Sequence, residues 1–476
     1  MPHLNLIRDN VEQVQDELQS SFELLQQAYN AQPNSSFEHR AGLLKLLKSA
    51  LLENQNALIT ALNSDFESRS DFDTVMADIM PTVSHINYTV KHLNKWMKAS
   101  PRKAGLLLSP SKLEVQYQPV GVVGIISPWN FPIMLSLAPL ATALAAGNRI
   151  MVKLSEYTPR TNEVIKDLLR PLDSHVQVVT GNAQIAAKFT SLKFAHLLFT
   201  GSTHTGRLVA QSAAKNLVPV TLELGGKSPV VITPSSDLNK VMDSIIFGKC
   251  VNAGQICVAP DYVLIEQDKA DAFAELFIER FITLYGNNPQ DFTHIINDTQ
   301  HRRLQQYLSE AELCESCRVV PVTGDALSDN SRRMLPHLVL NPDTELRLMR
   351  EEIFGPILPV VGYQNLEQAV AIINKGERPL ALYIMSEDDI STNYILNRTH
   401  SGGVAINDTI LQVAAEDAPF GGIGESGMGR YHGKEGFLSF SHARTVLRTP
   451  TWLPRARYML KAKSLTLRVL RKLFIK

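Results

Sequence analysis

The stretch Val122-Val123-Gly124-Ile125-Ile126 is a short apolar run that Pro128 ends, and Ile150-Met151-Val152 is the next such run. Between the two runs, residues 132–146 predict a helix. Short apolar runs that alternate with helices are typical of buried parallel strands joined by right-handed crossovers. We therefore predict an α/β fold with a doubly wound parallel sheet, whose usual ligand is a nucleotide.

The alternation extends through two regions that Gly225 and Gly226 separate. Strands are expected at 176–179, 194–199 and 218–223 before this break, and at 230–232 and 262–265 after it, where helices are expected at 238–251 and 269–285. The break predicts two α/β domains, with Glu223 at the end of the first and Cys257 early in the second. Because active sites form in clefts between domains, we expect these two side chains to face each other.

Composition limits the class of protein. At 476 residues the chain exceeds what one hydrophobic core usually serves, and its 47 acidic and 47 basic residues give no global charge that favours nucleic acid. The first residues lack the apolar core of a signal peptide, and no later run has the length of a membrane span. Four cysteines form no disulfide framework. We therefore expect a cytoplasmic protein.

Two segments lie outside the α/β pattern. In residues 112–118, Leu113, Val115 and Tyr117 alternate with polar residues, which predicts a half-exposed strand outside the main core. Residues 455–476 carry eight basic residues and no acidic one among apolar residues. Such a basic amphipathic tail lies either on an anionic membrane surface or over an apolar patch or a partner subunit, and both alternatives stay open.

Cys257 ends the segment Asn252-Ala253-Gly254-Gln255-Ile256-Cys257. A thiol attacks a carbonyl carbon when its thiolate is favoured and a separate base handles the protons. A free cysteine also packs as a small buried hydrophobe. The segment by itself is compatible with both interpretations.

Two glycine-rich segments are candidates for a phosphate-binding turn. Gly422, Gly424 and Gly427 form a literal Gly-x-Gly-x-x-Gly, but no strand precedes them and no helix opens behind them, so we reject this match. Residues 201–206 follow an apolar strand and open a helix, whose free amides favour an anion. A plain strand-to-helix connection is the alternative for this segment.

Lys153 and Glu156 follow the strand that ends at Val152, at the edge where doubly wound sheets bind their ligands. A carboxylate there accepts hydrogen bonds from a ribose diol and repels a 2′-phosphate, which favours NAD over NADP. A solvated Lys and Glu pair is the alternative. Cys314 and Cys317 form a Cys-x-x-Cys without further spaced ligands, so we expect no metal site.

Six segments, in order along the chain, resemble motifs of the aldehyde dehydrogenase superfamily between about residues 35 and 450. They are Pro128-Trp129-Asn130-Phe131-Pro132, Val152-Lys153-Leu154-Ser155-Glu156, Phe199-Thr200-Gly201-Ser202, Glu223-Leu224-Gly225-Gly226-Lys227, Gly254-Gln255-Ile256-Cys257 and Glu351-Glu352-Ile353-Phe354-Gly355. Residues 252–262, 378–383 and 426–434 are similar to the class 3 branch. Asp65-Phe66-Glu67-Ser68-Arg69-Ser70 is similar to bacterial coniferyl aldehyde dehydrogenases.

The resemblance implies a role for each matching residue. Cys257 is the implied nucleophile, Glu223 the general base, and Asn130 a donor to the oxyanion. The implied cofactor is NAD, with NADP as the second possibility. Its implied contacts are Trp129, Lys153, Ser155, Glu156, Gly201, Ser202, Glu352 and Phe354.

The implied activity is NAD-dependent oxidation of an aldehyde to the carboxylic acid through a cysteine thioacyl intermediate. The first expected substrate is coniferyl or a related aromatic aldehyde, and the alternative is a medium- or long-chain aliphatic aldehyde. A catalytically silent ligand-binding protein on the same fold is the alternative from another class.

The resemblance also implies the domains and a homodimer. The expected parts are an NAD-binding domain (1–105 and 121–225), an oligomerisation arm (106–120 and 436–450), a catalytic domain (226–435) and a basic amphipathic tail (451–476).

Overall fold

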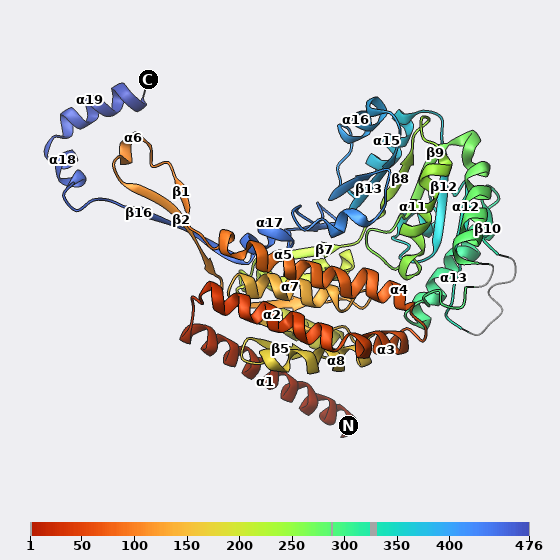
Figure 1. Ribbon diagram of the computed structural model, residues 1–476, viewed down its shortest axis with the longest axis horizontal. Helices are drawn as coiled ribbons and strands as arrows, with labels where there is room; N and C mark the ends of the chain where they lie inside the picture. Colours follow the sequence, from red (N-terminus) through yellow and green to blue (C-terminus); the bar gives the residue numbers. More distant parts are fainter. Residues whose placement is uncertain (1, 287–288, 324–330, 476) are drawn as a thin grey trace.

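The computed structural model describes residues 2–286, 289–323 and 331–475 of the chain. Two bodies, each built on one sheet, stand side by side, and a thin arm that carries the C-terminal tail projects from the first of them (Figure 1). Strands alternate with helices in both bodies. The prediction of an α/β fold with a doubly wound sheet, a second α/β domain and a small β arm is therefore confirmed.

The first sheet has six strands in the order β15-β7-β6-β3-β4-β5. Every residue of β3 and β4 is buried, as the two apolar runs predicted. The chain moves from β3 outward to β4 and β5, and then returns to the other side of β3 through β6 and β7. The strands are β3 (Val122–Ile126), β4 (Arg149–Lys153), β5 (Val176–Val179), β6 (His196–Gly201), β7 (Val220–Leu224) and β15 (Gly427–Met428). The order thus reverses between β3 and β6, and ligands of doubly wound sheets bind at such a switch point.

Helices cover both faces of the first sheet (Figure 1). They are α1 (Pro2–Ala31), α2 (Phe37–Glu53), α3 (Gln55–Asp65), α4 (Asp71–Thr74), α5 (Met80–Trp96), α7 (Met134–Ala145), α8 (Pro159–Leu169), α9 (Ala183–Thr190) and α10 (Thr203–Ala214). We did not predict α1 from the sequence, although Leu18, Phe22 and Leu25 recur in it at helical spacing. It buries Leu18, Phe22 and Leu25 in a cluster with strand side chains such as Val122 and Met151.

The second sheet has seven strands in the order β10-β11-β12-β9-β8-β13-β14, and only its edge strand β10 pairs antiparallel within the described chain. The strands are β8 (Pro229–Ile232), β9 (Tyr262–Glu266), β10 (Arg318–Pro321), β11 (His337–Leu340), β12 (Ile357–Tyr363), β13 (Ala381–Met385) and β14 (Gly403–Ile406). The helices of this body are α11 (Leu238–Cys250), α12 (Ala270–Tyr285), α13 (Asp298–Glu312), α14 (Arg347–Arg350), α15 (Leu366–Lys375) and α16 (Asp389–Leu396). The alternation that restarts after Gly226 therefore forms a separate sheet.

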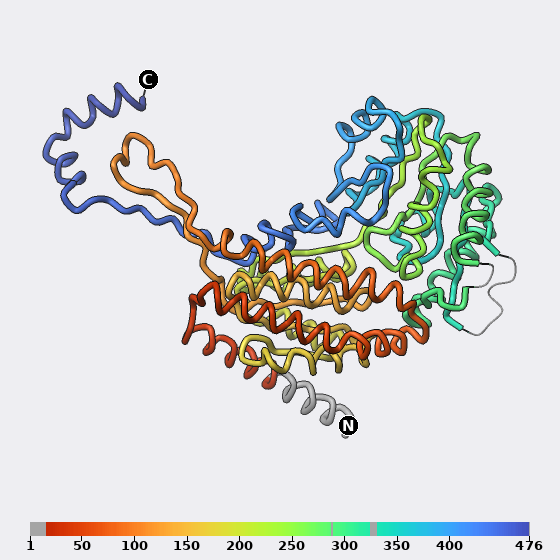
Figure 2. Tube along the Cα trace, viewed as in Figure 1, coloured from red at the N-terminus to blue at the C-terminus, as the bar shows by residue number. Residues whose placement is uncertain are grey.

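The arm is a three-stranded antiparallel sheet in the order β1-β2-β16. Its elements are β1 (Ser100–Arg102), α6 (Gly105–Leu108), β2 (Lys112–Pro119) and β16 (Ser441–Arg448), which α17 (Gly433–Ser439) precedes. The half-exposed strand predicted at residues 112–118 is confirmed as β2. Figure 2 shows this ribbon extending away from both bodies.

The basic tail forms two helices, α18 (Arg455–Lys461) and α19 (Lys463–Phe474), beside the tip of the arm (Figure 2). The Arg455 guanidinium donates to the Leu108 carbonyl at 2.7 Å, which ties the tail to the tip. Large apolar side chains stay exposed here, among them Leu106 and Leu465. No helix in the described part of the chain has the length and apolar character that crossing a membrane requires.

Two strands differ from the expected domain boundaries. β1 begins the arm at Ser100, before the expected start at residue 106. β15 lies within the range expected for the catalytic domain but pairs antiparallel with β7 of the first sheet, with Gly427 opposite Glu223. A two-residue strand that contains a glycine has no alternating apolar pattern, so the sequence offered no signal for it.

Candidate active site

A cavity of about 490 Å³ lies at the carboxyl ends of β3 and β6, where the first sheet faces the second domain. Its walls come from the first sheet and the loops that follow its strands, and from the Cys257 turn, residues 300 and 303, and residues 351–354 of the second domain. Eight of the predicted site residues line it: Trp129, Asn130, Gly201, Ser202, Glu223, Cys257, Glu352 and Phe354. The structure therefore brings the three expected reacting side chains and most of the expected cofactor contacts together.

Cys257 follows a backbone turn that few sequences adopt. Asn252 and Ala253 have φ values of 51° and 52°, and Gly254 follows at 70°. A side chain at Gly254 is excluded, because its Cβ would lie 2.7 Å from the Gly355 carbonyl oxygen. Non-glycine residues at positive φ are uncommon and strained, and such strain concentrates at functional sites.

The Cys257 thiol is half-buried in the cavity. Burial raises the pKa of this thiol to about 12, and the carboxyl groups of Glu352 and Glu223 add to the increase. A favoured thiolate is the condition that nucleophilic attack by a thiol requires. In the chain without cofactor the environment favours the neutral thiol instead, because nearby negative charge and a low dielectric both oppose ionisation.

Buried side-chain hydrogen bonds hold the Cys257 turn from both sides. The Gln255 side chain donates from Nε2 to the carbonyls of Asn252 and His294, both at 3.0 Å, and its Oε1 accepts from the Ile296 amide at 3.0 Å. A buried polar side chain with all of these partners rigidifies the backbone around it. The turn is therefore fixed before any ligand arrives.

Asn130 lies just after β3 and is buried. Its Nδ2 donates to the Gln255 carbonyl at 3.0 Å, so its side chain points toward the turn that contains Cys257. Both residues line the same cavity. An amide held in this place can donate to an oxygen that becomes negatively charged on a carbon bonded to Cys257.

Glu223 lies in β7 and is almost completely buried. Neither of its carboxyl oxygens has a hydrogen-bond partner among the described residues. Desolvation raises the pKa of this carboxyl well above its usual value, and the Arg430 cation lowers it only in part. A buried, unpartnered carboxyl beside a thiol is a candidate general base.

Glu352 and Phe354 belong to a loop that enters the cavity opposite Trp129. The Trp129 and Phe354 rings meet edge to face with their centroids 5.4 Å apart. Glu352 Oε1 is buried without a hydrogen-bond partner in the described chain, and burial raises the pKa of this carboxyl to about 8. The carboxyl also approaches Gly225, where an added Cβ would lie 2.0 Å from Glu352 Oε2. An orphaned acceptor at a cavity wall is compatible with a ligand hydroxyl.

The other predicted cofactor contacts lie at the same edge of the first sheet. Lys153 ends β4, opposite Ile126 of β3 in the strand register. Its Nζ lies 2.8 Å from Glu156 Oε2, with Lys153 buried and one third of the Glu156 side chain exposed. The structure does not place Lys153, Ser155 or Glu156 in the lining of the cavity around Cys257.

The phosphate candidate at residues 201–206 spans the end of β6, the cap residue Ser202 and the first turn of α10. Ser202 caps this helix by accepting from the Thr205 amide at 3.3 Å. The start of α10 borders the cavity, since Ser202, Thr203 and His204 all line it. In contrast, the Gly422-to-Gly427 match forms a loop closed by a bridge between Gly424 and Gly427, and no helix starts there. Rejection of that match is confirmed.

Sequence reasoning missed some residues that shape the cavity. Gln300 and Arg303 line it from α13, and Arg303 donates to the Ile353 carbonyl at 2.7 Å, which holds the Glu352 loop. Lys227 and Asp261 form an ion pair, and Asp261 accepts from the Ile353 amide at 2.9 Å. Apart from the helical spacing of Gln300 and Arg303, no local pattern signals these contacts, because they join distant segments.

The fold and cavity define a two-domain α/β protein that presents a cysteine thiol and a buried carboxyl at the switch point of a dinucleotide-type sheet. A family model described as aldehyde dehydrogenase family matches residues 9–446. A probable coniferyl aldehyde dehydrogenase of Pseudomonas aeruginosa is 46% identical over 440 residues, which are 91% of each chain.

Two solved structures share this fold. The substrate-bound state of Staphylococcus aureus AldH superposes with a TM-score of 0.86 at 34% identity, covering 93% of this chain and 98% of that one. A Mycobacterium tuberculosis aldehyde dehydrogenase complexed with NAD+ superposes with a TM-score of 0.82 at 27% identity, covering 92% and 90%.

The chain belongs to the aldehyde dehydrogenase family. The prediction of an aldehyde dehydrogenase enzyme is confirmed, and the catalytically silent alternative is not retained. The family acts on aldehydes with NAD or NADP as the cofactor.

Proposed function

We propose that this enzyme oxidises an aldehyde to the carboxylic acid with NAD, through a thioester on Cys257. The observation that carries the proposal is the single cavity lined by Cys257, Asn130 and Glu223. These residues supply a nucleophile, an oxyanion donor and a base, which are the three functions that acyl chemistry at a carbonyl carbon needs.

The reaction begins when the Cys257 thiol releases its proton to water and its thiolate sulfur bonds to the aldehyde carbon, so that the carbonyl oxygen becomes negatively charged. The Asn130 amide and the Cys257 backbone N–H stabilise this oxyanion. When bound, the nicotinamide supplies the hydride acceptor that brings the carbon to the acid oxidation level. Cys257 then holds the acyl group as a thioester. Glu223 takes a proton from water, whose oxygen attacks the thioester carbon, and the Cys257 sulfur leaves.

The residues present fit a dinucleotide. Ser202 and the free amides at the start of α10 would hold the phosphates, because a helix N-terminus favours anions. The orphaned Glu352 Oε1 would accept a ribose hydroxyl at the nicotinamide end, beside Phe354. Lys153, Ser155 and Glu156 would contact the adenosine ribose at the end of β4. The Glu156 carboxylate supports NAD over NADP, since it would repel a 2′-phosphate.

Coniferyl or a related aromatic aldehyde is the proposed substrate. The similarity to the Pseudomonas aeruginosa protein described as a probable coniferyl aldehyde dehydrogenase supports this choice. In a screen of NADH formation we expect the highest kcat/KM with coniferyl and cinnamyl-type aldehydes, and lower values for aliphatic aldehydes from hexanal to hexadecanal. A maximum at decanal length with little turnover of coniferyl aldehyde would assign the enzyme to aliphatic substrates.

The same screen, run with NAD and NADP, measures the role of Glu156. The wild type should favour NAD. Glu156→Gln should lower the ratio of kcat/KM for NAD over NADP by about tenfold. This is the factor expected when the cofactor loses about one hydrogen bond to a charged group. Asp167→Asn is a control, since this exposed carboxylate on α8 pairs with Arg170. An unchanged ratio in Glu156→Gln would remove Glu156 from the cofactor site.

We further propose a cytoplasmic homodimer that pairs through the arm and touches an anionic membrane surface through its tail. Four free thiols support the compartment. The projecting edge of the arm supports pairing of subunits, and exposed Leu465 and Leu473 among basic residues support the lipid contact.

Sedimentation without vesicles measures the pairing of subunits, and sedimentation with vesicles measures the contact of the tail with lipid. We expect a dimer in buffer, and co-sedimentation with phosphatidylserine vesicles but not with phosphatidylcholine vesicles. A chain that ends at residue 450 should stay dimeric and lose the vesicle contact. A monomer after this truncation would assign the tail to the subunit interface instead.

A further inference from the structure

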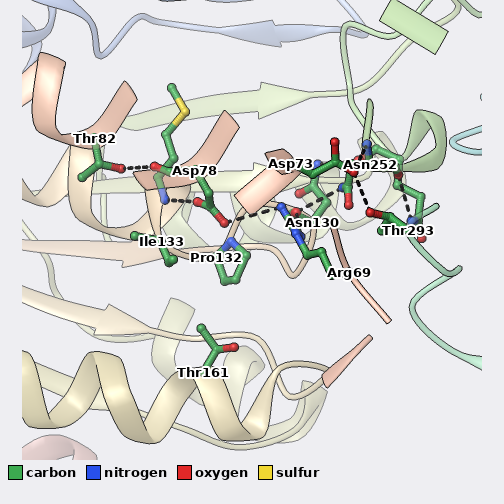
Figure 3. Close-up of polar contacts among 12 residues, drawn as sticks. Arg69, Asp73, Asp78, Thr82, Asn130, Pro132, Ile133, Thr161, Asn252 and Thr293 are labelled. Atoms are coloured by element: carbon green, nitrogen blue, oxygen red, sulfur yellow. Dashed lines mark hydrogen bonds and ion pairs between the residues drawn. The ribbon is translucent and has the colours of Figure 1, made fainter. Parts of the chain in front are cut away.

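Three charged side chains, Arg69, Asp73 and Asp78, are buried (Figure 3), and Arg69 contacts Asn130, which lines the cavity. They come from one short segment that spans the end of the Asp65-to-Ser70 motif, α4 and the π-helical turn Val75–Ile79. Arg69 and Asp78 have fully buried side chains, with 3.7 Å between Nη2 and Oδ2. Buried charges cost free energy unless well partnered, and replacing such pairs with apolar residues is often stabilising. Stability alone is therefore a weak reason for this cluster.

Arg69 holds the backbone of the residue that we propose as the oxyanion donor. Its Nη1 donates to the Asn130 carbonyl at 2.7 Å. The guanidinium carbon lies over two aromatic rings, 4.7 Å from the Phe66 centroid and 5.1 Å from the Phe131 centroid. Contacts with two rings leave the guanidinium little freedom to move. The position of the Asn130 backbone is therefore fixed by a rigid donor.

Asp78 holds the other end of the same segment. Its Oδ1 accepts from the Met134 amide at 2.5 Å, at the first residue of α7. Because Arg69 and Asp78 attract each other, they clamp residues 130–134 between the end of β3 and the start of α7. The direction of the Asn130 side chain depends on the course of this segment.

Asp73 connects the cluster to the Cys257 turn. Its Oδ2 accepts from the Asn252 amide at 3.0 Å and from the Thr293 hydroxyl at 2.6 Å. Asn252 is one of the residues at positive φ, and its Nδ2 donates to the Asn130 carbonyl at 3.2 Å. Arg69 and Asn252 thus both donate to the Asn130 carbonyl oxygen. The segment of the proposed oxyanion donor and the turn before the proposed nucleophile meet at that oxygen.

We propose that Arg69, paired with Asp78, is a positioning residue that sets the Asn130 amide against the oxyanion that forms on the carbon bonded to Cys257. The proposal rests on the proposed oxidation through Cys257. A donor must lie within hydrogen-bond reach of the oxygen as its charge develops, and small displacements from that place lower the rate. Losing a correctly placed donor costs about a hundred- to a thousandfold in rate, so misplacing it should cost about ten- to a hundredfold.

The test uses Arg69→Met together with Arg69→Met/Asp78→Asn. Methionine keeps an apolar stem against the two rings but donates no hydrogen bond. The single variant leaves the Asp78 charge without its partner and is expected to unfold at lower temperature. In the double variant, asparagine removes that charge and keeps an acceptor for the Met134 amide. The double variant therefore reports the effect of losing the hydrogen bond from Arg69 to the Asn130 carbonyl, without an unpaired buried charge.

The decisive readout is the acylation rate per titrated Cys257 thiol. We measure it with p-nitrophenyl acetate, which acylates a thiol without any cofactor, and with the NADH burst from an aldehyde. In the double variant both rates should fall about ten- to a hundredfold at an unchanged number of reactive thiols. The KM for NAD should change less than about twofold, because no cofactor contact is touched, and Arg69→Lys should recover part of the rate.

Arg40→Met is the matched control. Arg40 is a buried arginine of the same domain that donates to the Ala145 carbonyl at 3.1 Å, at the other end of α7. It should lower the unfolding temperature and leave the acylation rate per thiol unchanged. A double Arg69 and Asp78 variant that is folded and acylates at the wild-type rate would overturn the positioning role and leave the proposed function intact. A wild type without any NADH burst or ester acylation would overturn both.

Discussion

Cys257→Ala forms no NADH from any aldehyde and releases no p-nitrophenolate burst from p-nitrophenyl acetate. We expect this result because alanine has no atom that can bond to the carbonyl carbon, and the rate should fall by at least about a millionfold, as in other enzymes that lose their nucleophile. Serine at this position should also be inactive, since its hydroxyl is far harder to ionise than a thiol. Stopped-flow absorbance at 340 nm measures the burst.

Cys250→Ala provides the control for this variant. Cys250 is buried at the end of α11, and burial raises the pKa of its thiol. We expect this variant to keep both the burst and the steady rate, because Cys250 packs as an apolar side chain. Loss of activity in Cys250→Ala, with activity retained in Cys257→Ala, would assign the chemistry to the other thiol.

The pKa of Cys257 gives this prediction a pH dependence. Burial and two carboxyl groups raise this pKa to about 12, so the thiolate is the minor form at neutral pH. Below its pKa, the thiolate fraction rises about tenfold with each pH unit. Alkylation of Cys257 by iodoacetamide in the chain without cofactor should therefore accelerate steadily between pH 6 and 9. An alkylation rate that levels off near pH 7 would show that the pKa of this thiol is near 7 and that its surroundings favour the thiolate.

The sequence predicted the parts of this molecule that depend on local pattern. Apolar runs such as residues 122–126 became buried central strands, since a strand covered on both faces is apolar throughout. The break at Gly225 separated two sheets, and the residues on either side of it, Glu223 and Cys257, line one cavity. Their proximity followed from the general position of clefts between domains.

The missed features depend on contacts between distant segments. β15 is two residues long and carries no periodic pattern, so its pairing with β7 exists only in the folded chain. Arg69 lies within a quoted motif, but its role depends on a carbonyl 61 residues further along the chain. The raised pKa of Cys257 was also beyond the sequence, because desolvation is a property of the assembled cavity.

Glu223→Gln should give one burst of NADH and then almost no further turnover. Glutamine occupies the same space in β7 but takes no proton from water, so the thioester on Cys257 accumulates. A positioned general base contributes about a hundred- to ten-thousandfold, and the steady rate should fall by this factor while the burst amplitude stays near one per active site. Glu416→Gln is the control, since this carboxylate accepts from His85 and does not line the cavity. Equal steady rates in wild type and Glu223→Gln would remove Glu223 from the role of base.

The pH dependence of the two phases separates the base from the nucleophile. Desolvation raises the pKa of Glu223 well above its usual value and so favours the protonated carboxyl, whereas a base must be deprotonated to act. The hydrolytic rate of the wild type should therefore rise with pH toward this raised pKa, and in Glu223→Gln this rise should disappear. The burst rate should keep its rise in the same variant, because that rise follows ionisation of Cys257. If hydrolysis in Glu223→Gln still rose with pH as in the wild type, the proton would pass to a different group, and the buried carboxyl would only shape the cavity.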